Sequence, residues 1–98
     1  MMLSETSQQF YDKLAGEYDF ESHQFELLRL ACEALDRASQ AEEVINREGI
    51  TYDDRFGTPR TRPEVRVKVE AENAFRMLIK QLNLDEDESR PVGRPPGR

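Results

Sequence analysis

The stretch LLRLACEALDRASQAEEVINREGI, residues 27–50, decides the fold of this chain. Its apolar residues recur at alternating steps of four and three, which places them on one face of an α-helix. Gly49 interrupts this pattern and can take the left-handed conformation that ends a helix, with Ile50 folding back onto Ile45. With Ser22 as its N-terminal cap, the predicted helix spans residues 22–48 and is about 40 Å long.

A second long helix is predicted after a segment rich in turn-forming residues. The segment TYDDRFGTPRTRP, residues 51–63, contains Gly57, Pro59 and Pro63, and we interpret it as an ordered loop. Pro63 suits the first turn of the next helix, where no N–H donor is required. VRVKVE, residues 65–70, alternates like a strand, but its position after Pro63 favours a helix. Asn83 can end that helix in the left-handed conformation.

A short helix is predicted before the two long ones. Ser4 can cap it, and its aromatic and aliphatic residues recur at helical spacing up to Tyr18. We therefore predict an all-α fold, in which a short N-terminal helix packs on a long antiparallel helical hairpin over residues 1–84. Residues 85–98 contain an acidic run and then RPVGRPPGR, without hydrophobic periodicity, which predicts a disordered tail.

Both long helices carry apolar stripes that are wider than one partner helix needs. Either the short helix or a neighbouring subunit can cover the excess. A chain of 98 residues buries only a modest share of its surface, which favours the neighbouring subunit. The residues that we predict to form the oligomer interface are Leu27, Ala31, Ala34, Ala38, Ala41, Ile45, Ala74 and Leu78.

The sequence contains no pattern that is typical of an enzyme. One cysteine and one histidine, Cys32 and His23, cannot form a zinc site or an internal disulfide, and no glycine-rich phosphate-binding motif is present. Cys32 is predicted to be a partly buried packing residue and His23 to be exposed. We therefore predict no catalytic activity, no metal and no cofactor. The cysteine usage fits a cytoplasmic protein, and no apolar run reaches membrane-spanning length.

The charge distribution points to nucleic acid only locally. The net charge is −6, yet residues 50–83 hold seven basic and five acidic side chains. Arginines close to a helix N-terminus are suited to phosphate contacts, although a solvated loop that pairs with the acidic second helix is an equal alternative. The predicted DNA-binding residues are Arg55, Arg60, Arg62, Arg66, Lys68 and, in the tail, Arg94.

The tail contains a partial DNA-binding motif. Gly93-Arg94-Pro95 resembles the core of an AT-hook, in which an arginine enters the minor groove, but Val92 stands where that core has an arginine. A flexible solubilising tail is the alternative interpretation.

Four segments together resemble phage terminase small subunits whose body is a helical hairpin. They are LSETSQQFYDKLAGEY (3–18), LLRLACEALDRASQAEEVINREGI (27–50), RFGTPRTRPEV (55–65) and AENAFRMLIKQLNL (71–84). The resemblance implies a non-enzymatic part of a DNA-packaging motor in the host cell cytoplasm. Such subunits form homo-oligomeric rings, engage viral double-stranded DNA and regulate a large subunit that carries the ATPase and nuclease.

We expect no N-terminal helix-turn-helix, which many such subunits have, because the residues before Ser22 leave no room for one. The basic loop and the tail then remain as candidates for contacts with DNA or with the large subunit. We predict that the tail docks on the large subunit through Arg90, Arg94 and Arg98. The alternative function is a small dimeric DNA-binding regulator with an AT-hook-like C-terminal arm.

Overall fold

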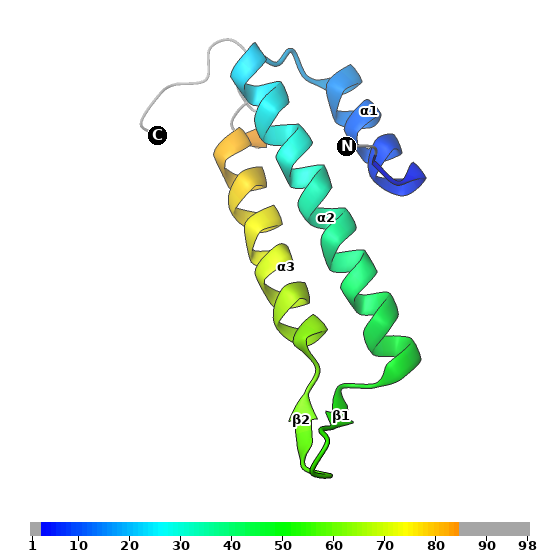
Figure 1. The fold of residues 1–98 in the computed structure, drawn as a ribbon. Coiled ribbons are helices and arrows are strands. Elements are labelled where there is room, and N and C mark those ends of the chain that lie inside the picture. The colour runs from blue at the N-terminus through cyan, green and yellow to red at the C-terminus, as the bar shows by residue number, and fades with distance from the viewer. Residues whose placement is uncertain (1–2, 85–98) are drawn as a thin grey trace.

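The structure is a computed structural model that describes residues 3–84. Its elements are α1 (Glu5–Glu17), α2 (Ser22–Glu48), β1 (Thr51–Asp53), β2 (Pro59–Thr61) and α3 (Pro63–Leu82). Helices α2 and α3 lie antiparallel, α1 lies along α2 near the start of that helix, and the strands form the far end (Figure 1). The predicted short helix and helical hairpin are confirmed, whereas the predicted disordered tail lies outside the described residues.

The segment after α2 is a β-hairpin, so its interpretation as a loop was wrong. Strands β1 and β2 pair antiparallel, with Thr51 opposite Thr61 and Tyr52 opposite Arg60. All six strand residues are exposed, so no alternation of buried and exposed positions marked them in the sequence. The hairpin extends the molecule beyond the ends of α2 and α3 (Figure 1).

Three predicted helix ends are confirmed. The backbone N–H of Ser7 donates to Ser4 Oγ at 3.2 Å, so Ser4 caps α1. Pro63 occupies the first turn of α3, where its missing N–H leaves no hydrogen bond unmade. Asn83 has φ 56° and ψ 48°, which is the left-handed conformation predicted for the end of α3.

The two ends of α2 differ from the prediction. Glu21 rather than Ser22 is the N-terminal cap, and its backbone N–H donates to Gln24 Oε1 at 2.9 Å. Gly49 has a positive φ of 94°, but its ψ of 174° is extended. The chain therefore continues directly towards β1, and Ile50 is 59% exposed instead of folding back onto the helix.

The core contains large side chains at one end of the helical hairpin and only small ones at the other end. At the α1 end, the rings of Phe10 and Phe75 lie 5.9 Å apart, so α1 also reaches α3 and covers part of both wide stripes within the chain. Larger buried side chains gather there, namely Leu14, Phe20, Leu28, Cys32 and Leu82. Towards the β-hairpin, α2 and α3 pack through the small side chains Ala34, Ala38, Ala41 and Ala71.

Cys32 is more deeply buried than the sequence indicated, since none of its surface is exposed. Burial, together with the nearby charge of Asp36, raises the pKa of the Cys32 thiol to about 11. The thiol is therefore protonated near neutral pH and acts as an apolar packing group. Within residues 3–84, no helix is both long and apolar enough to cross a membrane.

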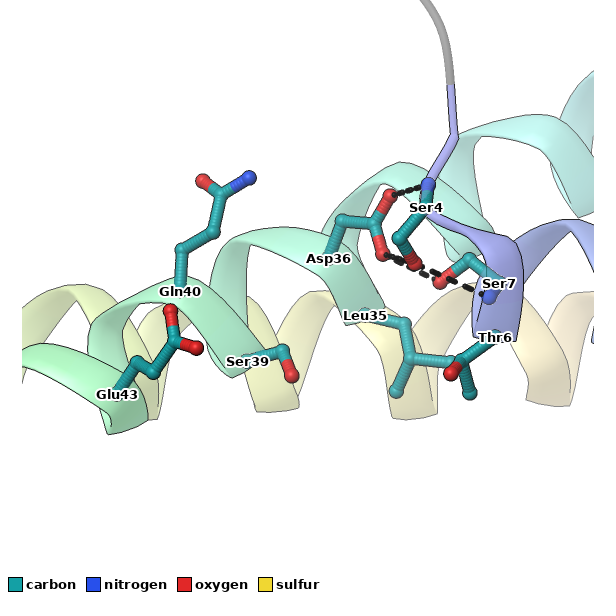
Figure 2. Close-up of a pocket in the computed structure, with 8 residues that line it drawn as sticks. All are labelled: Ser4, Thr6, Ser7, Leu35, Asp36, Ser39, Gln40 and Glu43. Carbon is teal, nitrogen blue, oxygen red and sulfur yellow. Dashed lines mark hydrogen bonds between the residues drawn. The ribbon is translucent and has the colours of Figure 1, made fainter. Parts of the chain in front are cut away.

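Asp36 fastens the start of α1 to the middle of α2. Its Oδ2 accepts the backbone N–H of Ser4 at 2.8 Å, and its Oδ1 accepts the hydroxyls of Ser4 and Ser7 at 2.6 Å each (Figure 2). Ser7 is buried, so its hydroxyl depends on this partner. Burial raises the pKa of Asp36, but the hydrogen bonds from both serines outweigh it and leave that pKa below its usual value.

Replacing this carboxylate should therefore destabilise the chain. We expect Asp36→Ala to lower the free energy of unfolding at neutral pH by about 2 kcal/mol, because the buried Ser7 hydroxyl loses its partner. A carboxyl whose pKa is lowered by folding stabilises the fold above its unfolded pKa of about 3.9, and this contribution is lost as the pH falls through the folded pKa. Urea unfolding of both proteins at a series of pH values measures the difference.

The control is Asp12→Ala, because Asp12 is exposed and accepts a side-chain hydrogen bond from Gln8 within α1. Its effect should stay below about 0.5 kcal/mol. A difference between wild type and Asp36→Ala that stays constant down to about pH 2 would contradict the assigned role.

Candidate nucleic-acid interface

The β-hairpin and the start of α3 carry the predicted basic residues 55–68 at the end of the molecule remote from α1 (Figure 1). The turn of the β-hairpin is held by Asp54, whose Oδ1 accepts the backbone N–H groups of Phe56 at 2.8 Å and Thr58 at 2.9 Å. Gly57 has φ 80°, a left-handed value that a side chain would strain. The hydrogen bonds from Thr58 and then Arg60 hold the pKa of Asp54 below its usual value. These hydrogen bonds therefore hold the turn in one conformation.

Two of the predicted arginines lie in the β-hairpin and differ in the groups that they contact. Arg60 donates from Nε to Asp54 Oδ2 at 2.9 Å, so its charge is largely compensated inside the hairpin. The Arg55 guanidinium lies 5.2 Å from the centre of the Phe56 ring, a cation–π contact that leaves its charge uncompensated. Arg55 therefore fits a phosphate contact better than Arg60.

Arg62 has a structural position. Its guanidinium donates to the carbonyls of Gly49 at 2.9 Å and of Glu48 and Thr51 at 3.2 Å each. It also lies 5.7 Å from the centre of the Tyr52 ring. A cation at the C-terminus of a helix satisfies carbonyl groups that have no partner within the helix. Arg62 thus ties the end of α2 to the β-hairpin, and few of its donors are left for DNA.

The two predicted cations at the start of α3 have acidic neighbours one turn further on. Arg66 pairs with Glu70 at 3.3 Å, and both side chains are strongly exposed. Lys68 pairs with Glu72 at 2.9 Å, and this partner raises the pKa of Lys68. Exposed pairs of this kind are weak and exchange readily for other partners. Arg66 is therefore available to an anion, while the tail residues Arg90, Arg94 and Arg98 lie outside the described residues.

One exposed residue of the hairpin was not singled out from the sequence. Phe56 stands in the turn and is 78% exposed, beside Arg55. The only sequence signal is an aromatic residue between the charged pair Asp54-Arg55 and Gly57, in a segment otherwise made of polar and turn-forming residues. A rigid turn that displays an aromatic ring and a cation can contact either bases or another protein.

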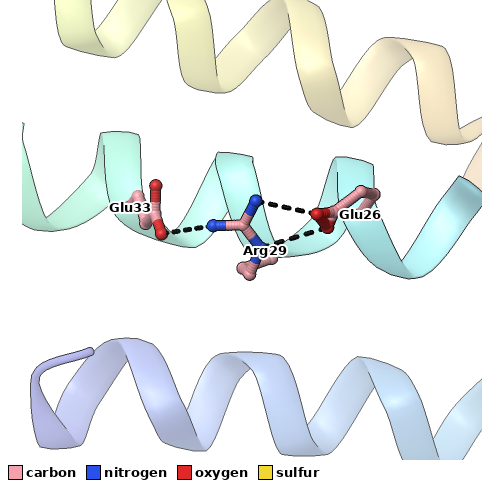
Figure 3. Close-up of polar contacts among 3 residues, drawn as sticks. All are labelled: Glu26, Arg29 and Glu33. Carbon is pink, nitrogen blue, oxygen red and sulfur yellow. Dashed lines mark hydrogen bonds and ion pairs between the residues drawn. The ribbon is translucent and has the colours of Figure 1, made fainter. Parts of the chain in front are cut away.

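The surface of α1 and α2 is acidic, in contrast to the hairpin. Arg29 is enclosed by two carboxylates: it donates to Glu26 at 2.8 and 3.1 Å and to Glu33 at 2.6 Å (Figure 3). The hydrogen bond with Glu26 raises the pKa of Arg29 and lowers that of Glu26. Residues 1–49 hold eleven acidic and four basic side chains, so this side repels DNA.

The predicted oligomerisation residues lie mostly inside the chain. Ala31, Ala34, Ala38 and Ala41 are buried in the single chain, so their burial needs no neighbouring subunit. The other four are half-buried, namely Leu27, Ile45, Ala74 and Leu78. Oligomerisation stays a prediction, and of these eight residues only the four half-buried ones keep surface that a second copy can contact. Within residues 3–84, no group of three or more His, Cys, Asp or Glu residues is placed to hold a metal ion.

Comparison with known proteins identifies one family. A family model described as phage terminase, small subunit, matches residues 8–95. No curated protein and no solved structure matches the chain. The family match covers α1 from residue 8 onward, α2, the β-hairpin, α3 and most of the segment 85–98.

The role of Arg62 can be separated from that of its neighbours by stability. We expect Arg62→Ala to lower the free energy of unfolding by about 1–2 kcal/mol, because three carbonyls lose a charged donor. Arg66→Ala is the matched control and should stay within about 0.5 kcal/mol of wild type, because it loses only an exposed ion pair. Equal urea-unfolding curves for Arg62→Ala and wild type would show that the carbonyls find water instead.

Proposed function

The chain belongs to the phage terminase small subunit family, and on this premise we propose that it is a ring-forming, non-enzymatic adaptor of the packaging motor. A role in phage DNA packaging follows from the family itself. Ring assembly, contact with viral double-stranded DNA and regulation of the large ATPase and nuclease subunit in the host cytoplasm are the finer parts of the proposal. The observation that carries it is the family match over residues 8–95 of a 98-residue chain.

The β-hairpin and the first turn of α3 are the proposed DNA contact within the described residues. Arg55 and Arg66 are both exposed, and neither is held by backbone carbonyls as Arg62 is. Contacts of this kind go to phosphates, so they bind any sequence and weaken as salt rises. The exposed ring of Phe56 adds an apolar contact at the same place.

Removing both exposed arginines should weaken DNA binding in a characteristic way. For Arg55→Ala/Arg66→Ala we expect weaker binding to all duplex sequences and a slope of log K against log salt that is shallower by about 2. Fluorescence anisotropy with a labelled duplex at several salt concentrations measures that slope.

The matched control is Arg37→Ala, which removes an exposed arginine from α2, far from the hairpin. It should leave the slope unchanged. A slope equal to that of wild type in the double variant would exclude Arg55 and Arg66 as the DNA contact.

The tail is the proposed contact with the large subunit. Residues 85–88 are acidic, while Arg90, Arg94 and Arg98 are basic, and at a Debye length of about 8 Å the two sets of charges partly cancel. A segment of this composition holds DNA poorly by itself. A peptide of mixed charge is better suited to docking on a protein surface of complementary charge.

Deleting residues 85–98 should affect the contact with the large subunit and leave the oligomer intact. No residue of the described core is removed, so helicity, thermal midpoint and oligomer mass should match those of the full chain. Stimulation of the large subunit's ATPase, or its co-purification, should fall. A chain with Arg90, Arg94 and Arg98 replaced by Ala tests whether the basic residues carry the effect, and loss of the oligomer on deletion would contradict the assignment.

A further inference from the structure

Helix α3 presents an exposed strip that faces away from α2. With 100° of rotation per residue, the residues of this strip fall within an arc of about 100° around the helix axis. The buried Ala71 and Leu82 lie on the opposite side of the helix. Val69 is 50% and Met77 61% exposed, so two large apolar side chains stand on this face of the helix. This basic strip contains two cations and no acid, and its residues are Val69, Asn73, Arg76, Met77 and Lys80.

An acidic hollow lies on the opposite flank of the molecule. It has a volume of about 400 Å³ and lies between the start of α1 and the middle of α2 (Figure 2). It contains the carboxylates of Asp36 and Glu43, the half-buried Leu35 and no basic side chain. Figure 2 shows Gln40 and Glu43 on α2, beyond the place where α1 begins.

The helical geometry of α2 places this hollow away from α3. Ala34 and Ala41 are buried at the contact with α3. Asp36 and Glu43 each follow one of these alanines by two residues, which is a rotation of about 200°. The basic strip and the acidic hollow therefore lie on opposite sides of the same chain.

The basic strip and the acidic hollow also lie at the same height along the axes of α2 and α3. Leu28 of α2 and Leu82 of α3 lie in one core cluster, and the charge of Glu42 acts on Lys68. Since the helices are antiparallel and rise equally per residue, residues 69–77 lie level with roughly residues 33–41. That range overlaps the part of α2 that lines the hollow.

We propose that the basic strip of one copy docks in the acidic hollow of a second copy. Met77 would pack against Leu35. In that register Arg76 lies level with Asp36 and about two helical turns from Glu43, so its charge faces the acidic side of the hollow. The opposite charges of the two surfaces favour a second copy, whereas DNA would leave Val69 and Met77 without an apolar partner. Two different surfaces on opposite flanks at one level make a heterologous contact that can close into a ring. This inference rests on the proposed ring function and specifies which surfaces build the ring.

Charge reversal within the strip tests the contact. Met77→Glu and Arg76→Glu should each reduce the mass measured by light scattering from that of the wild-type assembly towards that of one chain. Circular dichroism should remain unchanged, because both residues are exposed. Lys13→Glu is the control, since it makes an equal charge change on the exposed face of α1, outside both surfaces.

A compensating change supplies the decisive arm of the experiment. Glu43→Arg alone should also reduce the mass, because it reverses a charge of the hollow, and Arg76→Glu combined with Glu43→Arg should restore part of it. If wild type assembles but Met77→Glu and Arg76→Glu leave its mass unchanged, this inference fails while the proposed ring stands. A wild type that is monomeric overturns both. Weaker DNA binding without a change in mass would make the strip a DNA site and overturn the docking proposal.

Discussion

The close approach of α2 and α3 through alanine side chains is the contact that sets the shape of this molecule. Ala34, Ala38 and Ala41 of α2 are buried beside α3, with Ala71 on the facing helix. Small side chains let two helices run close together, but each buried methyl contributes only about 0.8 kcal/mol. A seam of this kind fixes the spacing of the helices while leaving much of the stability to be supplied at its ends.

Each end of the seam is secured by a different interaction. At one end, Leu14 and Phe10 of α1 pack against the helical hairpin of α2 and α3, and Asp36 holds the start of α1 in place. At the other end, Arg62 ties the carbonyls of Glu48, Gly49 and Thr51 together, so that the β-hairpin continues the helices as one unit. Apolar packing at one end and hydrogen bonds at the other thus supply stability that a larger protein would obtain from its core.

Local rules predicted most of the helical structure because the signals are local. Ser4, Pro63 and Asn83 act through their own backbone or side-chain geometry, and all three were identified correctly. The β-hairpin was missed because its strands are three residues long and exposed on both faces, so they carry no periodic signal. The true cap Glu21 was missed because serine is the stronger N-cap residue and stands next to it.

The candidate site was less predictable because side-chain roles depend on tertiary contacts. Arg55, Arg60, Arg62 and Arg66 look alike in the sequence, yet the structure gives Arg60 a carboxylate and Arg62 three carbonyls. The helical stripe identified correctly which alanines are buried. It could not show that α3 buries them within the same chain, because a periodic pattern does not specify its partner.

The buried polar side chains of the described residues already have hydrogen-bond partners, which limits what a second protein can offer the chain. Within residues 3–84, no buried side-chain nitrogen or oxygen lacks a hydrogen-bond partner. An assembly therefore gains little from new buried hydrogen bonds and has to draw on exposed apolar side chains and uncompensated charge. Met77 and Val69 on α3 and Phe56 on the β-hairpin are among the large apolar residues that remain exposed, and they mark two separate surfaces. One chain can therefore contact a neighbouring copy through α3 while its hairpin stays accessible to DNA.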